Sequence, residues 1–201
     1  MRDLVLIGGG GHCRSCIDVI ELENKFRILG VLDDNLRVGV PIGRYSVIGN
    51  DSDAEKIAEK QGGGGICFLV TVGFLKTLET RKNIFERFKN KVNMATVISP
   101  LAYVSKYASV GRGTIVLHHA MINFGAKVGE NCIINSKALI EHDAIVEDHC
   151  HVSTAVVING SVKIGHSSFV GSNSTVVQCM EIANSSFIKA NRIVKNGQKI
   201  C

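Results

Sequence analysis

The sequence has 201 residues, with 23 Lys and Arg against 18 Asp and Glu, which gives a net charge of +5. Hydrophobic residues make up 45% of the chain and charged residues 20%, and no apolar run approaches the length of a membrane span. The positive excess is mild and does not gather into a stripe, which argues against a nucleic-acid partner. It would help to attract an anionic ligand such as a phosphate ester.

The opening residues and the cysteines indicate the compartment. Residues 1–7 read as a strand followed at once by glycines, so we expect no signal peptide. Seven cysteines, an odd number with irregular spacing, predict a reducing cytoplasm. Cys13 and Cys16 match C-x-x-C, but no second pair accompanies them, and residues that pack the first helix are the favoured interpretation.

The first half of the chain, residues 1–95, is expected to form a small α/β domain. A buried strand is predicted over residues 4–7, followed by the glycine-rich turn Gly8-Gly9-Gly10-Gly11-His12. A helix over 13–23 and a second strand over 28–32 come next, and the second strand ends at Asp33-Asp34. Cys13 stands where the pattern G-x-G-x-x-G needs its third glycine. Half a Rossmann unit that binds a mononucleotide is therefore favoured over a dinucleotide site.

The rest of this domain is predicted from helical spacing and apolar runs. Helices are expected over residues 51–59 and 78–88, a flexible connector over 62–65 and a strand over 66–72. Pro41 and Pro100 are expected to fall in connections. The second proline marks the entry to the next domain, whose start we expect near residue 95.

The second half, residues 96–201, repeats every six residues. Ile or Val occupies every sixth position from Ile98 to Ile200, 18 in succession, and a small residue often lies two positions earlier. A chain that turns a corner every six residues needs one such aliphatic plug on each side. The pattern predicts a parallel β-helix with three short strands per triangular coil, in which residue i stacks under residue i+18 at ~4.8 Å. Cys132 and Cys150, 18 residues apart, are then interior packing residues.

Histidines gather in the middle of this repeat. Five of the seven lie between His118 and His151. His142 follows the plug at Ile140 by two residues and should lie on a turn, where Asp143 could orient its ring and raise its basicity for general base catalysis. Gly160, one coil further on, could offer an unobstructed N–H as an oxyanion donor.

Two other interpretations of the histidines stay open at this point. A histidine on a solvent-facing turn is often only a polar surface residue. His149 and His151 lie close enough in sequence to help hold a cation where several chains meet. Cys150, beside His151, should point inward, which argues against a thiol nucleophile.

Three motifs in this chain resemble those of the bacterial sugar acetyltransferases related to PglD and NeuD, and the resemblance covers the chain from end to end. The motifs are Gly8-Gly9-Gly10-Gly11-His12, Leu32-Asp33-Asp34, and Asn135-x5-Glu141-His142-Asp143 with His151. The resemblance implies a Rossmann-like nucleotide-sugar-binding domain over 1–95. It also implies a left-handed β-helix over 96–201, which binds acetyl-CoA and carries the catalytic residues in a homotrimer without a metal.

The same resemblance implies roles for single residues. His142 matches the catalytic base, and Asp143 the residue that increases its basicity. Substrate contacts would come from Gly10, Gly11, His12, Asp33, Asp34, Gly73 and Asn135, and acetyl-CoA contacts from His151, Ser172 and Ala190. Residues 194–201 lack the Gly-x-Pro-Ala-Lys ending common in relatives, a departure that bears on the contacts to CoA.

The expected function is acetyl-CoA-dependent N-acetylation of a nucleotide-linked amino-dideoxy sugar, of the UDP-4-amino-sugar type. The amine would attack the thioester directly, because one cleft that orients both substrates needs no acyl-enzyme. One alternative is O-acetylation of a sialic or related nonulosonic acid by the same base. Another is a non-catalytic or metal-binding β-helix trimer, against which the separate α/β domain argues.

Overall fold

The computed structural model describes residues 1–60, 65–73 and 77–195. It divides into two compact units, Met1–Val97 and Ile98–Cys201. Nearly all of the connector expected over 62–65, the plug expected at Ile200 and the chain after Lys195 lie outside the described residues. Within the described ranges, no helix is long and apolar enough to cross a membrane.

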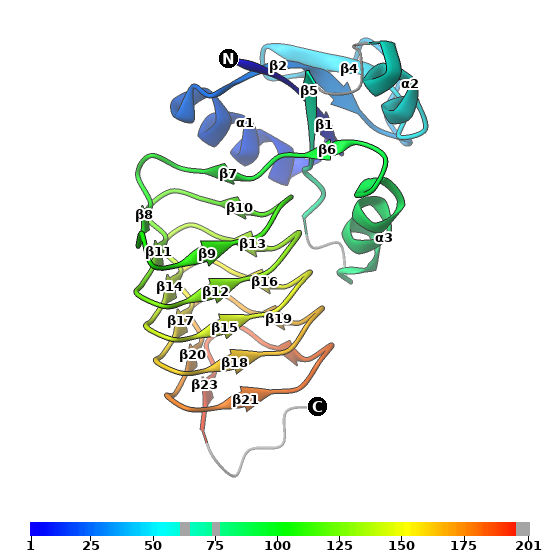
Figure 1. Cartoon of the computed structure of the whole chain (residues 1–201). Helices are drawn as coiled ribbons and strands as arrows, with labels where there is room; N and C mark the ends of the chain where they lie inside the picture. The colour runs from blue at the N-terminus through cyan, green and yellow to red at the C-terminus, as the bar shows by residue number, and fades with distance from the viewer. Residues whose placement is uncertain (61–64, 74–76, 196–201) are drawn as a thin grey trace. The chain divides into compact units, whose positions relative to one another are not determined.

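The first unit is built on a six-stranded sheet with the strand order β3-β4-β2-β1-β5-β6 (Figure 1). Its strands are β1 (Arg2–Ile7), β2 (Phe26–Leu32), β3 (Pro41–Ile42), β4 (Tyr45–Gly49), β5 (Ile66–Val70) and β6 (Asn93–Met94). Its helices are α1 (Gly11–Glu23), α2 (Asp53–Lys60) and α3 (Glu79–Phe88). Strand β1 pairs in parallel with β2 and with β5, which places the turns after these three strands at one edge of the sheet.

Apolar side chains explain why these elements pack. Strand β5 is buried at every position, and so are residues 4–7 of β1. Phe85 and Phe88 of α3 join Val5, Ile7 and Phe68 in one core cluster. Burial of such side chains supplies most of the free energy that holds a small domain together.

The sequence predicts the helices and central strands of this unit to within a few residues but misses the hairpin β3–β4. Pro41, expected in a connection, is the first residue of β3 and lies opposite Ser46 in an antiparallel pair. This prediction was wrong because β3 is the edge strand of the sheet. On an edge, the missing N–H of proline costs no ladder hydrogen bond.

The second unit is a parallel β-helix with three faces, each named here by its first strand. The β7 face contains β7 (Val97–Ile98), β10 (Ile115–Val116), β13 (Ile133–Ile134), β16 (His151–Val152), β19 (Phe169–Val170) and β22 (Phe187–Ile188). The β8 face contains β8 (Tyr103–Val104), β11 (Met121–Ile122), β14 (Leu139–Ile140), β17 (Val157–Ile158), β20 (Thr175–Val176) and β23 (Ile193–Val194). The β9 face contains β9 (Ser109–Val110), β12 (Lys127–Val128), β15 (Ile145–Val146), β18 (Lys163–Ile164) and β21 (Glu181–Ile182).

The coils stack with the predicted spacing of 18 residues. Met121 pairs with Leu139, and Leu139 pairs in turn with Val157, always in parallel (Figure 1). The plugs from Val116 to Val194 are at most 3% exposed, and Cys132 and Cys150 lie among them in the core. The predicted β-helix and its interior are therefore confirmed.

Each corner of the coil has a recurrent backbone conformation. Positive φ angles occur at every sixth residue from Gly113 to Asn191, always three residues after a plug. Glycine, asparagine and aspartate tolerate this region best, but Lys137 and Ala155 adopt it as well. Their N–H groups donate to carbonyls of the preceding coil, and these bonds offset the backbone strain.

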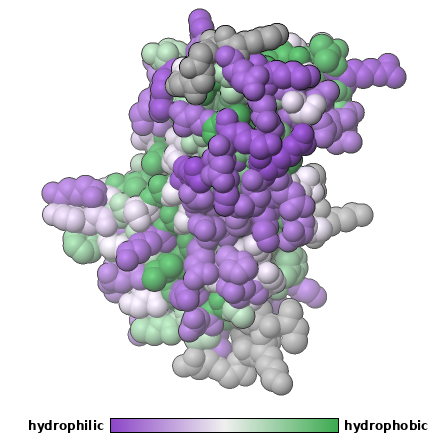
Figure 2. Space-filling model, turned by 45° about the vertical axis from the view of Figure 1, so that its right-hand side comes forward, coloured by the Kyte–Doolittle hydropathy of each residue, from purple (hydrophilic) through white to green (hydrophobic). Residues whose placement is uncertain are grey.

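Hydrophilic side chains predominate on the face of the molecule in Figure 2, with hydrophobic side chains between them. Large hydrophobic side chains are also exposed on the β-helix: Leu101, Tyr103, Tyr107, Phe124, Phe187 and Ile193. Single exposed apolar residues are ordinary, but aromatic residues that gather at one place point to a binding role.

Candidate functional site

His142 lies on the edge between the β8 and β9 faces, in the turn between β14 and β15. Its Nδ1 is 3.0 Å from Asp143 Oδ2, and its backbone N–H donates to Glu141 Oε2 at 3.2 Å. The same carboxylate oxygen accepts a hydrogen bond from Asn123 Nδ2 at 2.8 Å. Sequence reasoning assigned no role to Glu141 or Asn123, although their spacing of 18 would have placed them side by side.

Asp143 is held by the coil that precedes it. Its φ of 60° belongs to the recurrent corner conformation, and its N–H donates to the carbonyl of Phe124 at 3.0 Å. A Cβ on Gly125 would lie 2.5 Å from Asp143 Oδ1, so the carboxylate occupies the space beside this glycine, whose φ of 71° also disfavours other residues. The fixed backbone leaves Asp143 beside the imidazole of His142.

The structure adds a steric role for Gly160, which the sequence predicts as an oxyanion donor. A Cβ at this position would lie 2.6 Å from His142 Nε2 and 2.7 Å from Cε1. The imidazole therefore occupies the space that a side chain at residue 160 would fill. Gly160 leaves room for the ring in this position, and its role as an oxyanion donor stays a prediction.

The His142–Asp143 pair lies at the surface of the single chain. The two side chains are 60% and 61% exposed, respectively. Solvent at this level screens the interaction between imidazolium and carboxylate. A strong effect of Asp143 on His142 would need a bound substrate or a second protein surface to exclude water.

Three of the predicted contact residues, Asn135, Ser172 and Ala190, lie on a different edge, the one between the β7 and β8 faces. Asn135 Nδ2 is 3.3 Å from His151 Nε2. His151 is only 6% exposed and meets the ring of Phe169 edge-on, with 5.1 Å between ring centroids. Asn135, grouped by resemblance with the sugar contacts, thus lies against a residue grouped with the CoA contacts.

Ser172 and Ala190 occupy equivalent positions in successive coils of this edge. The hydroxyl of Ser172 is 2.9 Å from that of Ser153. A Cβ on Gly171 would lie 2.4 Å from the backbone nitrogen of Ala190, so the chain passes closely there. Within one chain, these residues therefore lie on the edge between the β7 and β8 faces, which also carries Asn135 beside His151. They do not lie on the edge that carries His142.

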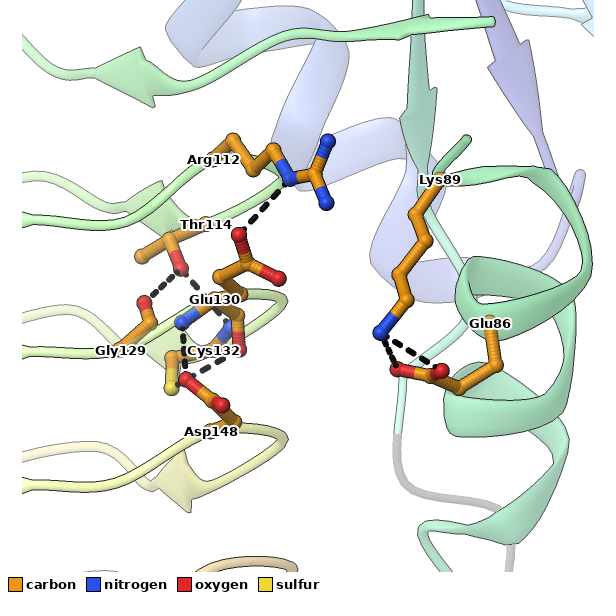
Figure 3. Close-up of polar contacts among 8 residues, drawn as sticks. All are labelled: Glu86, Lys89, Arg112, Thr114, Gly129, Glu130, Cys132 and Asp148. Atoms are coloured by element: carbon orange, nitrogen blue, oxygen red, sulfur yellow. Dashed lines mark hydrogen bonds and ion pairs between the residues drawn. The ribbon is translucent and has the colours of Figure 1, made fainter. Parts of the chain in front are cut away.

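The third edge, between the β9 and β7 faces, carries a polar column (Figure 3). Arg112 Nε donates to Glu130 Oε1 at 2.7 Å, and the Glu130 N–H donates to Asp148 Oδ1 at 2.7 Å. Figure 3 also draws the ion pair between Glu86 of α3 and Lys89 at the end of that helix. Both features have partners within the chain and read as structural contacts.

The histidines near the polar column do not assemble a metal site within the described ranges. His149 Nδ1 is 3.0 Å from the side-chain amide of Asn131. Among the described residues, no group of three or more His, Cys, Asp or Glu side chains is arranged to hold a metal ion.

In the first unit, the glycines of the turn after β1 have different surroundings. Gly8 has a φ of 105°, and a Cβ on it would lie 2.4 Å from Val72 Cγ2, so it is required by the fold. The N–H of Gly9 donates to Asp33 Oδ2 at 2.7 Å. A Cβ on Gly10 or Gly11 would meet nothing within 4 Å. Space beside these two glycines, at the start of α1, is therefore open.

The aspartates after β2 organise this edge of the sheet. Asp33 Oδ1 accepts hydrogen bonds from the N–H groups of Asn35 and Leu36, and Asp34 Oδ1 accepts one from the N–H of Asp51. Burial, and then the charges of Asp34 and Asp33, raise the pKa of Asp51 to about 6. Sequence reasoning missed Asp51, because its burial depends on how β4 and α2 pack.

His12 is kept neutral by its surroundings. Burial, and then the charge of Arg81, lower its pKa to about 3. The residue as a whole is half-buried, but its Nε2 is fully buried and has no hydrogen-bond partner in the part of the chain that the structure describes. Gly73 lies beside it, since a Cβ there would be 3.0 Å from the Cβ of His12.

Arg81 is a buried cation that sequence reasoning missed. It is 2% exposed and donates from one guanidinium nitrogen to the carbonyls of Val70 and Val72. It therefore holds the carboxyl end of β5 and places a positive charge near the expected substrate residues. In the sequence, Arg81 is one of several charged residues in a predicted amphipathic helix, and nothing there distinguishes it from the exposed ones.

The C-x-x-C motif behaves as packing. Cys13 and Cys16 are fully buried in α1, and burial raises the pKa of Cys13 to about 11 and that of Cys16 further. A thiol with a raised pKa carries little thiolate at neutral pH. This favours the predicted packing role for both residues.

Comparison with known proteins finds a family model that resembles the first unit. Residues 3–88 match the family model of the PglD N-terminal domain. Over 118 residues, 58% of this chain, the sequence is 29% identical to the UDP-N-acetylbacillosamine N-acetyltransferase of Bacillus subtilis (strain 168). The aligned part spans 52% of that protein, about half of its length.

Solved structures extend the likeness to the β-helix. A His-to-Asn variant of perosamine N-acetyltransferase from Caulobacter crescentus, in complex with CoA and GDP-perosamine, superposes with a TM-score of 0.86 at 24% identity, covering 96% of this chain and 88% of that one. The acetyltransferase domain of PglB from Neisseria gonorrhoeae FA1090, in complex with acetyl coenzyme A, gives 0.85 at 23%, covering 98% and 94%. The predicted resemblance to PglD-like proteins is thus confirmed in sequence over residues 3–88, and the two solved structures share the predicted fold over nearly the whole chain.

Proposed function

We propose that this protein transfers the acetyl group of acetyl-CoA to the amino group of a nucleotide-linked amino-dideoxy sugar, with His142 as the general base. The observation that carries the proposal is the geometry of His142, whose Nδ1 lies 3.0 Å from Asp143 Oδ2 while Nε2 lies over Gly160 at an open corner. The fold supports it, since two structural neighbours are a sugar N-acetyltransferase and an acetyltransferase domain.

The chemistry follows from the two nitrogens of the imidazole. With Asp143 accepting a hydrogen bond from Nδ1–H, Nε2 carries the lone pair that can take a proton. The substrate amine attacks the thioester carbonyl, a C–N bond forms, and the proton passes to Nε2. The C–S bond then breaks and CoA leaves as the thiolate or thiol. Asp143 stabilises the imidazolium that forms in between.

The first unit offers features suited to a nucleotide sugar. Open space beside Gly10 and Gly11 adjoins the N-terminus of α1, where backbone N–H groups and the helix dipole favour phosphate. The neutral His12 is half-buried as a residue and is a further proposed substrate contact, through the part of its side chain that is exposed. Asp33 and Asp34 are the proposed contacts to the nucleoside, for which UDP is the expected type.

The proposed site needs more than one copy of the chain. His142 and Gly160 lie on one edge of the β8 face, and Ser172 and Ala190 lie on the other. The outward side chains of the face between them are largely apolar: Tyr103, Met121, Leu139, Val157, Thr175 and Ile193. If a second copy packed on this face, the edge of one copy that carries His142 would lie near the edge of the other copy that carries Ser172 and Ala190. The expected homotrimer requires such a contact.

A panel of substrates tests the proposal. Nucleotide-linked 4-amino sugars and free sialic acids are incubated with acetyl-CoA, and CoA release is measured. We expect release only with the amino sugars, and a loss of at least ~10²-fold in rate for His142→Ala, the lower range for losing a general base. His166→Ala, an exposed histidine on another edge, is the matched control and should keep the wild-type rate. An unimpaired His142→Ala enzyme would remove His142 from the mechanism, and activity on sialic acid alone would favour O-acetylation.

A further inference from the structure

The proposed reaction leaves two exposed aromatic residues beside His142 unexplained. Phe124 precedes His142 by 18 residues and so occupies the same corner one coil earlier. Phe124 is 54% exposed, and the neighbouring Tyr107 is 58% exposed. Their ring centroids are 4.5 Å apart, with 41° between the ring planes. The two rings therefore form one aromatic surface, here called the Tyr107–Phe124 platform.

Hydrogen bonds connect the backbone of Phe124 to the coil that carries His142. The carbonyl of Phe124 accepts from the N–H of Asp143 at 3.0 Å, and the Phe124 N–H donates to Asn123 Oδ1 at 2.8 Å. Asn123 in turn donates to Glu141 Oε2, which also accepts from the N–H of His142. These bonds fix the position of residue 124 relative to the base, one strand spacing of ~4.8 Å away along the column.

A cation completes the column on the far side of the platform. Lys106 occupies this corner one coil before Phe124, and its Nζ lies 4.9 Å above the ring centroid of Tyr107. In chain order the corner thus presents an ammonium group, an aromatic surface and an imidazole. The span from Lys106 to His142 is two coils, about 10 Å.

We propose that the Tyr107–Phe124 platform receives the hexose ring of the acceptor substrate and selects sugars with an apolar face. This inference rests on the proposed function. A nucleotide-linked amino sugar carries a diphosphate, a hexose ring and an amine in that order, which is the order of Lys106, the platform and His142. The aromatic surface offers a large apolar area to the C–H groups of the sugar and to a methyl group in place of a hydroxymethyl group. Lys106 supplies a positive charge for the phosphate that adjoins the hexose.

The test compares Phe124→Ala with the wild type on two nucleotide-linked amino sugars, one with a methyl group and one with a hydroxymethyl group on C5. We expect KM for the methyl sugar to rise about tenfold, the upper range for an aromatic contact, and KM for acetyl-CoA to stay within about twofold. The preference of the wild type for the methyl sugar, measured as the ratio of kcat/KM values, should be about tenfold or more and should fall in the variant. Tyr107→Leu should show the same trend more weakly.

Leu101→Ala is the matched control, because Leu101 is an apolar residue 50% exposed on a different edge. It should change none of these constants. An active wild type whose Phe124→Ala variant keeps both KM values and the sugar preference overturns the platform while leaving the proposed function intact. A Phe124→Ala variant that changes its molar mass in light scattering also overturns it, because the pair would then belong to a contact between copies. A wild type that acetylates no amino sugar refutes the proposed function itself.

Discussion

At the scale of single residues, the candidate site depends on space as much as on chemistry. The ring of His142 and the carboxylate of Asp143 each lie where a Cβ of a neighbouring coil would be, at Gly160 and Gly125. Both glycines thus have a steric role, whatever else Gly160 contributes as a predicted oxyanion donor. Each lacks a Cβ, and the space this leaves at the corner is occupied by a functional side chain of the adjacent coil.

Replacing Gly160 with alanine should therefore impair catalysis without unfolding the protein. The new Cβ would lie 2.6 Å from His142 Nε2, so the exposed ring must turn away. We expect kcat to fall by about 10²-fold, the effect of a misplacement near 1 Å, with an unchanged thermal midpoint. Steady-state kinetics and thermal unfolding check this. Wild-type kcat in the variant would show that the ring has another productive position.

His12 should make the stability of the protein depend on pH. Its pKa is about 3 in the folded state and 6.5 in the unfolded state, so between these values the unfolded chain binds more protons and acid destabilises the fold. The loss is at most about 1.4 kcal/mol per pH unit below 6.5. In His12→Gln, the free energy of unfolding should fall less between pH 7 and 4.5 than it does in the wild type.

Denaturant titrations at both pH values measure this difference. The pKa of Asp51 is raised from 3.8 to about 6, so Asp51 acts with the opposite sign. Between these two values the folded chain binds more protons, and the stability contributed by the protonated carboxyl group is lost as pH rises through about 6. The His12→Gln comparison cancels this contribution, since Asp51 is present in both proteins. Equal pH slopes for wild type and variant would contradict a buried neutral His12.

At the scale of elements, the two-residue strands of the β-helix divide their side chains between the core and the surface. In β18, Ile164 is fully buried among the plugs, while Lys163 points outward and pairs with Glu147 and Glu181. Exposed ion pairs contribute little to stability, whereas a buried aliphatic side chain contributes several kcal/mol. Adjacent residues of one strand should therefore differ sharply.

Ile164→Ala should lower the free energy of unfolding by about 2–5 kcal/mol, from lost burial and the cavity left behind. Lys163→Ala, one position earlier, should leave the unfolding free energy close to that of the wild type. Chemical denaturation of both variants provides the measurement. A large loss in the lysine variant, or a small one in the isoleucine variant, would mean that the plugs do not dominate the stability of the coils.

At the scale of the whole molecule, the β8 face is proposed to lie between copies of the chain. Leu139 points outward from the middle of that face and is half-buried in the single chain. Leu139→Glu would place a charge in the proposed contact, and an unpaired buried charge is strongly unfavourable. We expect the molar mass in light scattering to fall from that of a trimer to that of a single chain, and the acetyltransferase rate to fall with it.

Ile145→Glu is the control, since Ile145 also points outward and is half-buried, but on the largely polar β9 face. It should keep the assembly and the rate. A wild type that is already a single chain in solution, yet fully active, would refute the need for a second copy.

The sequence by itself determined the β-helix, its interior and its coil register, because a six-residue period is a local pattern that every coil repeats. It also placed His142 and Asp143 on a corner, and the spacing of 18 placed Gly160 beside them. The tertiary structure decided what the period does not encode. Asp33 supports the N–H of Gly9, Arg81 lies buried below the end of β5, and Asn135 meets His151. These contacts depend on sheet register and side-chain direction, which arise only when separate elements pack against one another.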